Sequence, residues 1–163
     1  MKLGRASAYG LLALLSIARR NGNGDGNGNG HGREPGPAHR AGHGPAQGIT
    51  ACEIADATGV PVEYLRKIMQ RLAHARIVRS ERGRSGGFRL RRPARRVNLL
   101  QVVEAIEGPL DEIAILDDPL LHTSNDPVHR QLKRWRHTAT IRLREMLRET
   151  TLEDMLEESP VRA

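Results

Sequence analysis

The sequence predicts a mainly α-helical chain with one small β-hairpin and a long helix near its C-terminal end. Most apolar side chains recur at intervals of three and four residues, which is the spacing of an amphipathic helix. Two short β-compatible runs flank a glycine-rich tip, which is typical of a hairpin. The 163 residues include only one Trp, two Tyr and one Phe. The core must therefore be built from Leu, Ile, Val, Ala and Met, which suits helices better than a large sheet.

Residues 3–19 predict a first amphipathic helix, because the leucines and alanines of this segment fall on one face. Residues 20–48 are predicted to be a flexible insert, because glycine, asparagine, proline, histidine and arginine leave almost no side chain to bury. The insert contains the run NGNGDGNGNGHG at 21–32. One alternative for this insert is a histidine-based metal tract, although glycine flexibility works against a preformed site. The other is a chain of tight Asn-Gly turns, but no β-forming runs flank the repeats for a hairpin to join.

A pair of helices joined by a tight turn is predicted next. Thr50 and Glu53 have the spacing of a capping box, in which each side chain bonds the other residue's amide at the start of a helix. We expect that helix over 51–57. Gly59 then provides a position that tolerates positive φ, and a second helix follows over 61–75. This order is the helix-turn-helix arrangement.

The second helix has two distinct faces. Apolar residues that share one face are Leu65, Ile68, Met69 and Leu72. Polar and charged residues that point elsewhere are Glu63, Tyr64, Arg66, Lys67, Gln70 and Arg71. This division suits a helix that packs on one side and enters a DNA groove on the other.

A β-wing is predicted after the second helix. Residues 77–81 and 88–91 are β-compatible, and the tip between them carries Arg82 and Arg84 with three glycines. The glycines let the backbone turn sharply, and the arginines have nothing apolar to pack on, so they are candidates for a narrow minor groove. An ordinary surface hairpin is the alternative. With the wing, the predicted fold is a winged helix-turn-helix.

The C-terminal part predicts a dimerisation element. The string NLLQVVEAIEG forms another helix, residues 111–125 are acidic and irregular, and a long helix follows over 126–149. Its apolar residues are spaced almost as a heptad, which favours pairing with a second copy over packing on its own domain. The stripe consists of Val128, Leu132, Trp135, Ala139, Leu143 and Met146. We therefore divide the chain into a DNA-binding domain over 1–108, which includes the insert, and a linker, dimerisation helix and tail over 109–163.

Charge favours a polyanionic partner. The formal net charge is +7, and the segment from Tyr64 to Arg96 has 12 Lys and Arg against one Glu. Nucleic acid is the commonest partner of such a segment. The alternative is a solvated surface in an arginine-rich proteome.

Several functional classes receive no support. One cysteine, Cys52, excludes an internal disulfide framework, and we expect it to be a buried packing residue, with redox sensing as the alternative. No catalytic constellation or phosphate-binding glycine loop is present, so we do not expect an enzyme. No signal peptide or membrane span is recognisable, which predicts a cytoplasmic protein. A metal site involving Asp126 and His129 remains an open alternative, but no tight ligand spacing supports it.

Three strings together resemble a known family. MKLGRASAYGLLALLSIA, EIADATGVPVEYLRKIMQRLAHARIVRSERGRSGGFRLRRP and NLLQVVEAIEGPL are similar to the winged-helix transcriptional regulators of the Rrf-two type, the family of IscR, NsrR and CymR. The resemblance covers residues 1–19 and 48–110, and more weakly the long helix. It implies a homodimer on a roughly palindromic operator of double-stranded DNA, with the second helix in the major groove and the wing in the minor groove.

The resemblance also implies individual DNA contacts. Arg66 stands where several family members have glutamate, so the operator read by this chain is expected to differ from theirs. The positions that match the family's recognition helix are Glu63, Tyr64, Arg66 and Lys67. Those that match its wing arginine and wing glycines are Arg82, Gly86 and Gly87, and those near its phosphate contacts are Lys2, Ser7 and Tyr9.

The departure from the family concerns sensing. Cluster-binding members carry three cysteines before the long helix, and this chain has none between residues 109 and 130. We therefore predict no iron-sulfur cluster, no other cofactor and no metal. The expected function is that of a sequence-specific transcriptional regulator, a repressor, acting as a homodimer. The alternatives are a non-specific architectural DNA-binding protein and a regulatory subunit that works mainly through a protein partner.

Overall fold

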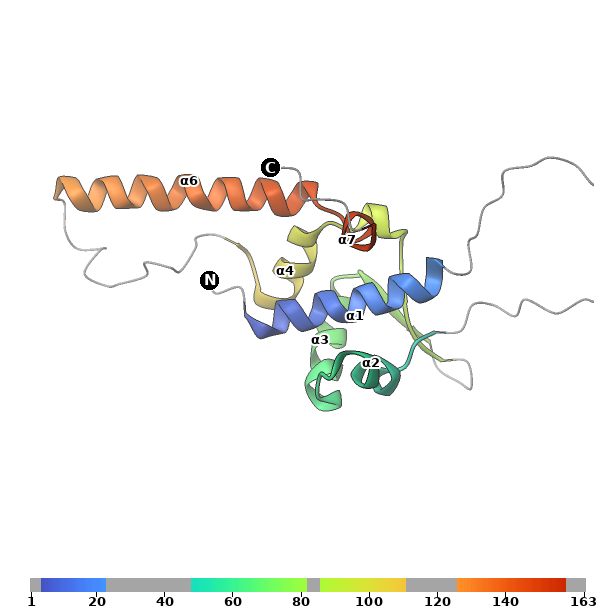
Figure 1. The fold of residues 1–163 in the computed structure, drawn as a ribbon. Helices are drawn as coiled ribbons and strands as arrows, with labels where there is room; N and C mark the ends of the chain where they lie inside the picture. Colours follow the sequence, from blue (N-terminus) through green and yellow to red (C-terminus); the bar gives the residue numbers. More distant parts are fainter. Residues whose placement is uncertain (1–3, 23–47, 82–85, 111–125, 158–163) are drawn as a thin grey trace, which may run out of the picture.

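The structure of the protein is a computed structural model, which describes residues 4–22, 48–81, 86–110 and 126–157 (Figure 1). The long helix α6 extends away from the body formed by the other elements, and α1 runs across that body. In chain order the elements are α1 (Arg5–Gly22), α2 (Ala51–Thr58), α3 (Val62–His74), β1 (Val78–Glu81), β2 (Gly87–Leu90), the short 3-10 helix η1 (Ala94–Arg96), α4 (Leu99–Glu107), α6 (Pro127–Glu149) and α7 (Leu152–Leu156).

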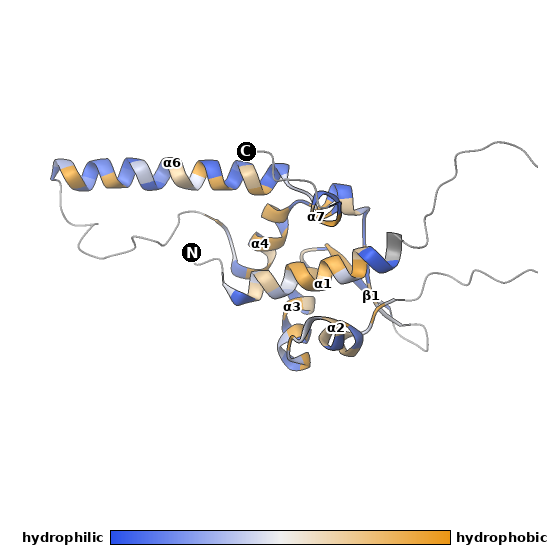
Figure 2. Ribbon diagram, in the orientation of Figure 1, coloured by the Kyte–Doolittle hydropathy of each residue, from blue (hydrophilic) through white to orange (hydrophobic). Residues whose placement is uncertain are grey.

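The body is held together by one apolar core, and α1 lies at its centre. Helix α1 contacts α2, α3, α4, β2 and α7. Its residues Ala13, Leu14 and Ile17 are fully buried. Hydrophobic colouring runs along α1 and α4 in Figure 2, whereas α6 alternates between apolar and polar bands. The predicted mainly α-helical fold with a small two-stranded wing is confirmed.

Helix α1 is longer than the sequence predicts. It continues to Gly22, so Arg20 belongs to the helix and the prediction that the insert begins at residue 20 is wrong. The Nη1 atom of Arg20 lies 2.8 Å from Oε1 of Glu53 on α2. This ion pair gives the last turn of α1 a partner that local sequence patterns do not reveal. The rest of the predicted insert, 23–47, lies outside the described residues.

Helix α2 begins at the predicted capping box. The Glu53 amide donates to Oγ1 of Thr50 at 3.2 Å, and the Thr50 amide donates to Oε2 of Glu53 at 2.7 Å. The helix ends at Gly59, whose φ of 70° is the left-handed conformation that glycine adopts without strain. Cys52 is exposed, so the prediction that it packs in the core is wrong. Ile54 and Ala55 take the buried face of this short helix, which leaves Cys52 facing solvent.

The carboxylate of Glu53 makes the stability of this junction depend on pH. Hydrogen bonds from the Thr50 amide, the Arg20 guanidinium and the Thr50 hydroxyl lower the pKa of Glu53 from 4.5 to about 2. Because the folded chain holds this proton less readily than the unfolded chain, the contribution is complete above about pH 4.5 and is lost as the pH falls toward 2. We expect the thermal midpoint of Glu53→Gln to lie below that of the wild type at pH 7 and to converge with it near pH 2.

Thermal unfolding followed by circular dichroism at several pH values measures this effect. Asp56→Asn is the matched control, because it removes a carboxylate from the same helix that makes no side-chain hydrogen bond to the described residues. A difference between Glu53→Gln and the wild type that stays constant from pH 7 to pH 2 would contradict the assignment.

The two-stranded wing is joined on its second edge by a backbone segment that precedes α2. Strands β1 and β2 pair antiparallel, with Val78 opposite Leu90. On the other edge of β2, Ile49 and Phe88 exchange backbone hydrogen bonds of 3.2 and 2.8 Å. Gly87 has a φ of +139°, and a Cβ there would lie 2.7 Å from the carbonyl carbon of Gly48. Gly87 therefore lets the backbone at Gly48 and Ile49 approach the wing.

The C-terminal end of the described chain returns to the body. The prediction of a tail after residue 149 is wrong in part, because residues Leu152–Leu156 form helix α7. The signal was present, since Thr151 and Asp154 form the same capping box as at the start of α2. Thr151 forms an isolated antiparallel bridge with Asn98, and the amide of Leu152 donates to Val97 O at 2.9 Å. The Leu152 side chain is fully buried in the core.

Candidate nucleic-acid interface

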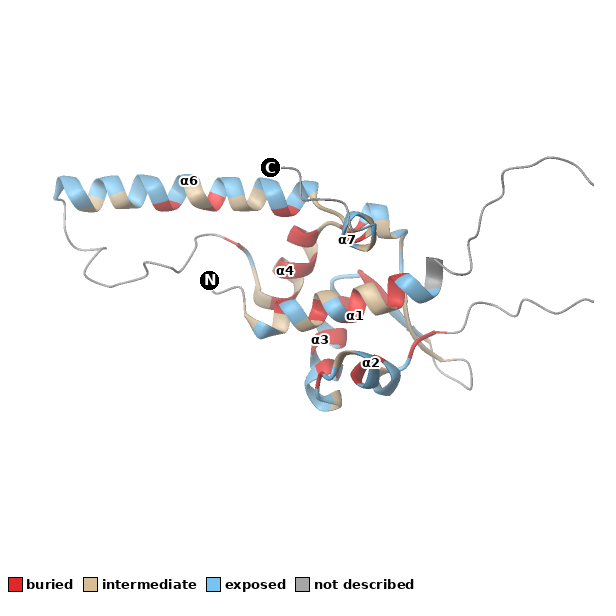
Figure 3. Cartoon of the chain, viewed as in Figure 1, coloured by how far each residue is buried: buried red, intermediate tan, exposed pale blue. Residues whose placement is uncertain are grey.

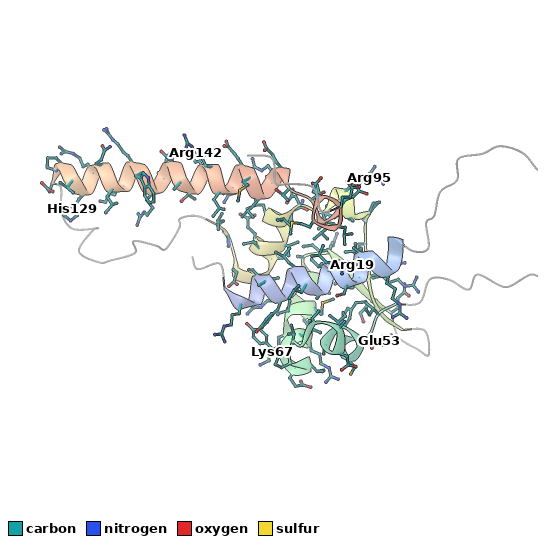
Figure 4. All side chains as sticks on the ribbon, in the orientation of Figure 1. Arg19, Glu53, Lys67, Arg95, His129 and Arg142 are labelled. Carbon is teal, nitrogen blue, oxygen red and sulfur yellow. The ribbon has the colours of Figure 1, made fainter. Side chains whose placement is uncertain are left out.

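The face of α3 that points away from the core carries the residues predicted for the recognition helix. Its opposite face is buried, as the spacing predicts, through Leu65, Ile68, Met69 and Leu72. Figure 4 shows Lys67 on the outer side of α3, below α1. The outward residues are Glu63, Tyr64, Arg66, Lys67 and Gln70, and all of them are exposed. Helix α3 thus presents a row of polar and charged side chains to solvent on a rigidly packed support.

Tyr9 of α1 and Tyr64 of α3 meet at the edge of this face. Their ring centroids are 5.8 Å apart and the ring planes are nearly perpendicular, at 87°. Such an edge-to-face arrangement is favourable for two aromatic rings. The structure therefore brings together two residues that the sequence analysis selected from segments 55 positions apart. Tyr9 is half-buried and Tyr64 is exposed.

Ser7 is placed differently from the expectation that it contacts phosphate. It is buried, and its hydroxyl donates to Oε1 of Glu107 at 2.9 Å. Its amide donates to the same oxygen at 3.3 Å. These bonds fasten α1 to the end of α4, so Ser7 is not presented to a ligand. Lys2, which the sequence analysis grouped with it, lies outside the described residues.

Arg71 also has a partner within the chain. Its Nη1 atom donates to the carbonyl oxygen of Ile106, near the C-terminal end of α4. A cation at this end interacts favourably with the helix dipole and with the unpaired carbonyls. Arg71 therefore ties α3 to α4 through one nitrogen while the residue remains exposed, and its predicted contact with DNA stays a prediction.

The wing is described only in part. Arg82 and Arg84, predicted at its tip, lie outside the described residues. At the last described residue before the tip, Glu81 forms ion pairs with two arginines, 3.2 Å from Nε of Arg79 and 3.1 Å from Nε of Arg89. Gly87 is restrained by its contact with Gly48, and Gly86 precedes it at the start of β2. The glycine requirement at Gly87 thus arises within the protein, which the sequence analysis did not foresee.

Exposed arginines also follow the wing. Arg91, Arg95 and Arg96 are exposed, and Figure 4 shows Arg95 near α7, on the opposite side of α1 from Lys67. The sequence predicts no individual role for these arginines beyond their share of the basic charge. Arg95 therefore adds positive charge on the side of α1 away from Lys67.

The predicted apolar stripe on α6 is largely uncovered. Val128 is 71% exposed and Trp135 is 57% exposed, and Met146 is also exposed. Leu132, Ala139 and Leu143 are half-buried. The buried residues of α6, which are Arg136, Thr140 and Leu147, occupy a neighbouring strip of the helix (Figure 3). The long helix therefore has one strip that faces its own chain and, beside it, an apolar strip in which Val128, Trp135 and Met146 are exposed while Leu143 packs against the core.

The C-terminal end of α6 is fastened to α4. Arg144 donates to the carbonyl oxygen of Leu110 at 2.6 Å and lies 3.1 Å from Oε1 of Glu104. The same carboxylate oxygen accepts from the amide of Leu110 at 3.3 Å. The end of α4 therefore meets α6 through Arg144, α3 through Arg71 and α1 through Ser7.

The described residues do not assemble a metal site. Asp126 caps the start of α6 by accepting from the Val128 amide at 3.2 Å, and it lies 3.4 Å from Nδ1 of His129. Among residues 4–22, 48–81, 86–110 and 126–157, no group of three His, Cys, Asp or Glu side chains could hold an ion. The Asp126 carboxylate thus has a structural role at the helix start.

The fold and this surface define a winged helix-turn-helix DNA-binding protein. A family model for Rrf2, described as an iron-dependent transcriptional regulator, matches residues 39–158. The chain belongs to the Rrf2 family of transcriptional regulators, which are not enzymes. None of the helices in the described part of the chain is long and apolar enough to cross a membrane.

Individual relatives support the same family. The HTH-type transcriptional regulator Rv1287 of Mycobacterium tuberculosis is 35% identical over 106 residues, which cover 63% of this chain and 63% of that protein. The match therefore spans less than two thirds of that relative. CymR of Bacillus subtilis is 25% identical over 160 residues, covering 95% of this chain and 89% of that protein. The structure of CymR, the global cysteine regulator of that organism, has the same fold, with a TM-score of 0.68 at 22% identity over 98% of this chain and 99% of CymR.

The cysteine content of this chain does not fit an iron-sulfur cluster. Iron-sulfur clusters are held by several cysteine thiolates, in some centres with histidines. The sequence contains one cysteine, Cys52, and it is exposed on α2 within the helix-turn-helix. A single thiolate on that helix cannot form a thiolate set for a cluster within one chain.

Proposed function

We propose that the protein is a sequence-specific transcriptional repressor that binds a palindromic operator as a homodimer. The observation that carries this proposal is the division of α3, whose apolar face is buried while its polar face is exposed, on a helix that also contacts strand β1 of the wing. A rigidly supported helix of this kind suits the major groove, with phosphate neutralisation for affinity and a few base contacts for specificity. The residues of the candidate DNA-binding surface are Tyr9, Glu63, Tyr64, Arg66, Lys67, Arg82 and Arg84.

The homodimer is supported by the apolar strip of α6. A helix that leaves Val128, Trp135 and Met146 exposed gains free energy when a second apolar surface covers them. Since the heptad-like spacing suits another helix, we assign this strip to α6 of a second copy. Residues 1–108 then form the DNA-binding domain and 109–163 mainly the dimerisation element, although α7 packs on the former.

Regulation is proposed to proceed without an iron-sulfur cluster. The support is chemical, since the chain has a single cysteine. Purification without oxygen, followed by absorption spectroscopy and iron analysis, tests this part of the proposal. Stoichiometric iron with visible cluster absorption would reject it.

Sequence specificity is tested by selection of bound fragments from the genomic DNA of the native host. A repressor of this kind enriches one roughly palindromic sequence upstream of a small set of genes. Enrichment of no common sequence, at comparable overall affinity, would instead favour a non-specific architectural protein. Expression of the neighbouring genes in a deletion strain then distinguishes repression from activation.

Removal of the wing arginine provides a direct test of the minor-groove contact. We expect Arg82→Ala to weaken binding to the selected operator by about 1–3 kcal/mol. Fluorescence anisotropy at fixed salt measures the change. The matched control is Arg95→Ala, which removes one exposed arginine on the side of α1 away from α3. Equal losses for the two variants would mean that only total charge matters at Arg82.

A further inference from the structure

The outward face of α3 carries an ion pair. The Nη1 atom of Arg66 lies 2.8 Å from Oε1 of Glu63, and the two residues are three positions apart on the helix. The side chain of Arg66 is 54% exposed and that of Glu63 is 81% exposed. Ion pairs this exposed contribute little to folding stability, because water screens them and both side chains lose freedom. The contact is therefore of more interest for what it does to Arg66 than for stability.

The contact leaves most of the guanidinium available. Arginine has five N–H donors in a planar fork, and the bond to Glu63 uses one nitrogen, Nη1. Two donors of the fork can still approach O6 and N7 of one guanine, which is the pairing that arginine makes in the major groove. A guanidinium already held in one orientation loses less freedom on binding than an unrestrained one. The geometry thus presents a partly oriented arginine to the groove.

The Glu63 carboxylate also has an unfavourable effect on DNA binding. A negative charge on the groove-facing side of α3 is repelled by the phosphates, so its removal should strengthen non-specific binding. Specific and non-specific binding are therefore expected to respond to Glu63 in opposite directions. This opposition separates a positioning role from a simple charge effect.

We infer that Glu63 is a positioning residue that aims the Arg66 guanidinium at one guanine of the operator. The inference rests on the proposed sequence-specific function. It adds the base that is recognised, a guanine, and the pair of residues that recognises it. Arg66 makes the base contact, and Glu63 acts through Arg66. The amide oxygen of a glutamine at position 63 can accept from Nη1 as the carboxylate does, whereas an alanine cannot.

The test starts with the full-length chain and a randomised DNA duplex library, from which a preferred sequence is selected. The wild type and Arg66→Ala are then compared for binding to single-base variants of that sequence. The guanine that Arg66 contacts is the one whose replacement weakens binding of the wild type but not of Arg66→Ala. We expect Glu63→Ala to reduce discrimination at that guanine by about 5-fold or more, a part of the roughly 5- to 150-fold that a bidentate contact provides. Glu63→Gln should stay within about 2-fold of the wild type at the same position.

Non-specific binding provides the second readout. Glu63→Ala and Glu63→Gln each remove one negative charge, so both should bind an unrelated duplex more tightly, and by equal factors. The double variant Glu63→Ala/Arg66→Ala should discriminate no worse than Arg66→Ala alone, because the effect of Glu63 passes through Arg66. Asp56→Asn, on α2, is the control for loss of an exposed carboxylate and should leave discrimination unchanged. Thermal unfolding checks that every variant is folded.

Three results would overturn the inference while leaving sequence-specific binding intact. Equal discrimination by the alanine and glutamine variants would mean that Glu63 acts only through its charge and does not position Arg66. Loss of discrimination at a different base in Glu63→Ala would mean that the carboxylate reads a base, such as cytosine, itself. Unchanged specificity in Arg66→Ala would remove the arginine from the readout. Selection of no preferred sequence by the wild-type chain would overturn both this inference and the proposed function.

Discussion

Leu152→Ala is expected to lower the free energy of unfolding by about 2–5 kcal/mol, the usual cost of truncating a fully buried leucine. The Leu152 side chain is fully buried in the core, and its amide donates to Val97 O at 2.9 Å. Its helix α7 also contacts α1 and η1. Truncation would leave a cavity where the end of the chain meets the DNA-binding domain. Urea unfolding followed by circular dichroism measures the change in midpoint.

Met155→Ala is the matched control for this experiment, because Met155 lies on the same short helix and is exposed. We expect that variant to unfold within about 0.5 kcal/mol of the wild type, as is usual for surface substitutions. If Leu152→Ala also unfolded like the wild type, α7 would contribute nothing to the core in solution.

Trp135→Arg is expected to convert the dimer into a monomer and to weaken operator binding by about 100-fold or more, because a monomer loses the second half-site contact. Trp135 lies in the middle of the uncovered strip of α6 and is 57% exposed. An arginine in that strip would place two like charges, one from each copy, into an apolar interface. Light scattering coupled to gel filtration gives the oligomeric state, and fluorescence anisotropy gives the affinity for the selected operator.

Ile141→Arg provides the control on the same helix. Ile141 is exposed on the side of α6 that faces away from both the Trp135 strip and the buried Thr140. The Ile141→Arg substitution introduces the same charge outside the proposed interface, so the dimer should persist. A wild-type chain that is monomeric at micromolar concentration, or a Trp135→Arg variant that remains dimeric, would contradict the proposed interface.

Local sequence patterns were sufficient to predict helix α2, the turn after it and the two faces of α3. The capping box at Thr50, the turn at Gly59 and the buried face of α3 follow from contacts within one or two helical turns. For the same reason the exposed face of α3 was predictable before any contact was known. The helix α7 was predictable too, because its capping box at Thr151 repeats the pattern found at Thr50.

Individual roles on that surface depended on partners distant in sequence. Ser7 was grouped with DNA contacts, yet Glu107, 100 positions away, accepts its hydroxyl. Arg71 looked like an outward-facing cation, yet the carbonyl of Ile106 accepts from it. No periodicity within α1 or α3 contains this information, because the partners belong to α4.

The sequence by itself determined the helix-turn-helix, the wing and the two faces of α3, since each depends on hydrogen bonds and apolar spacing among near neighbours. Only the tertiary structure decided that Gly87 serves the approach of Gly48, that Arg20 extends α1 to reach Glu53, and that Leu152 closes the core. These features depend on which surfaces meet when the helices pack together. Packing brings together residues that the chain separates, and the resulting contacts set which side chains remain free to meet DNA.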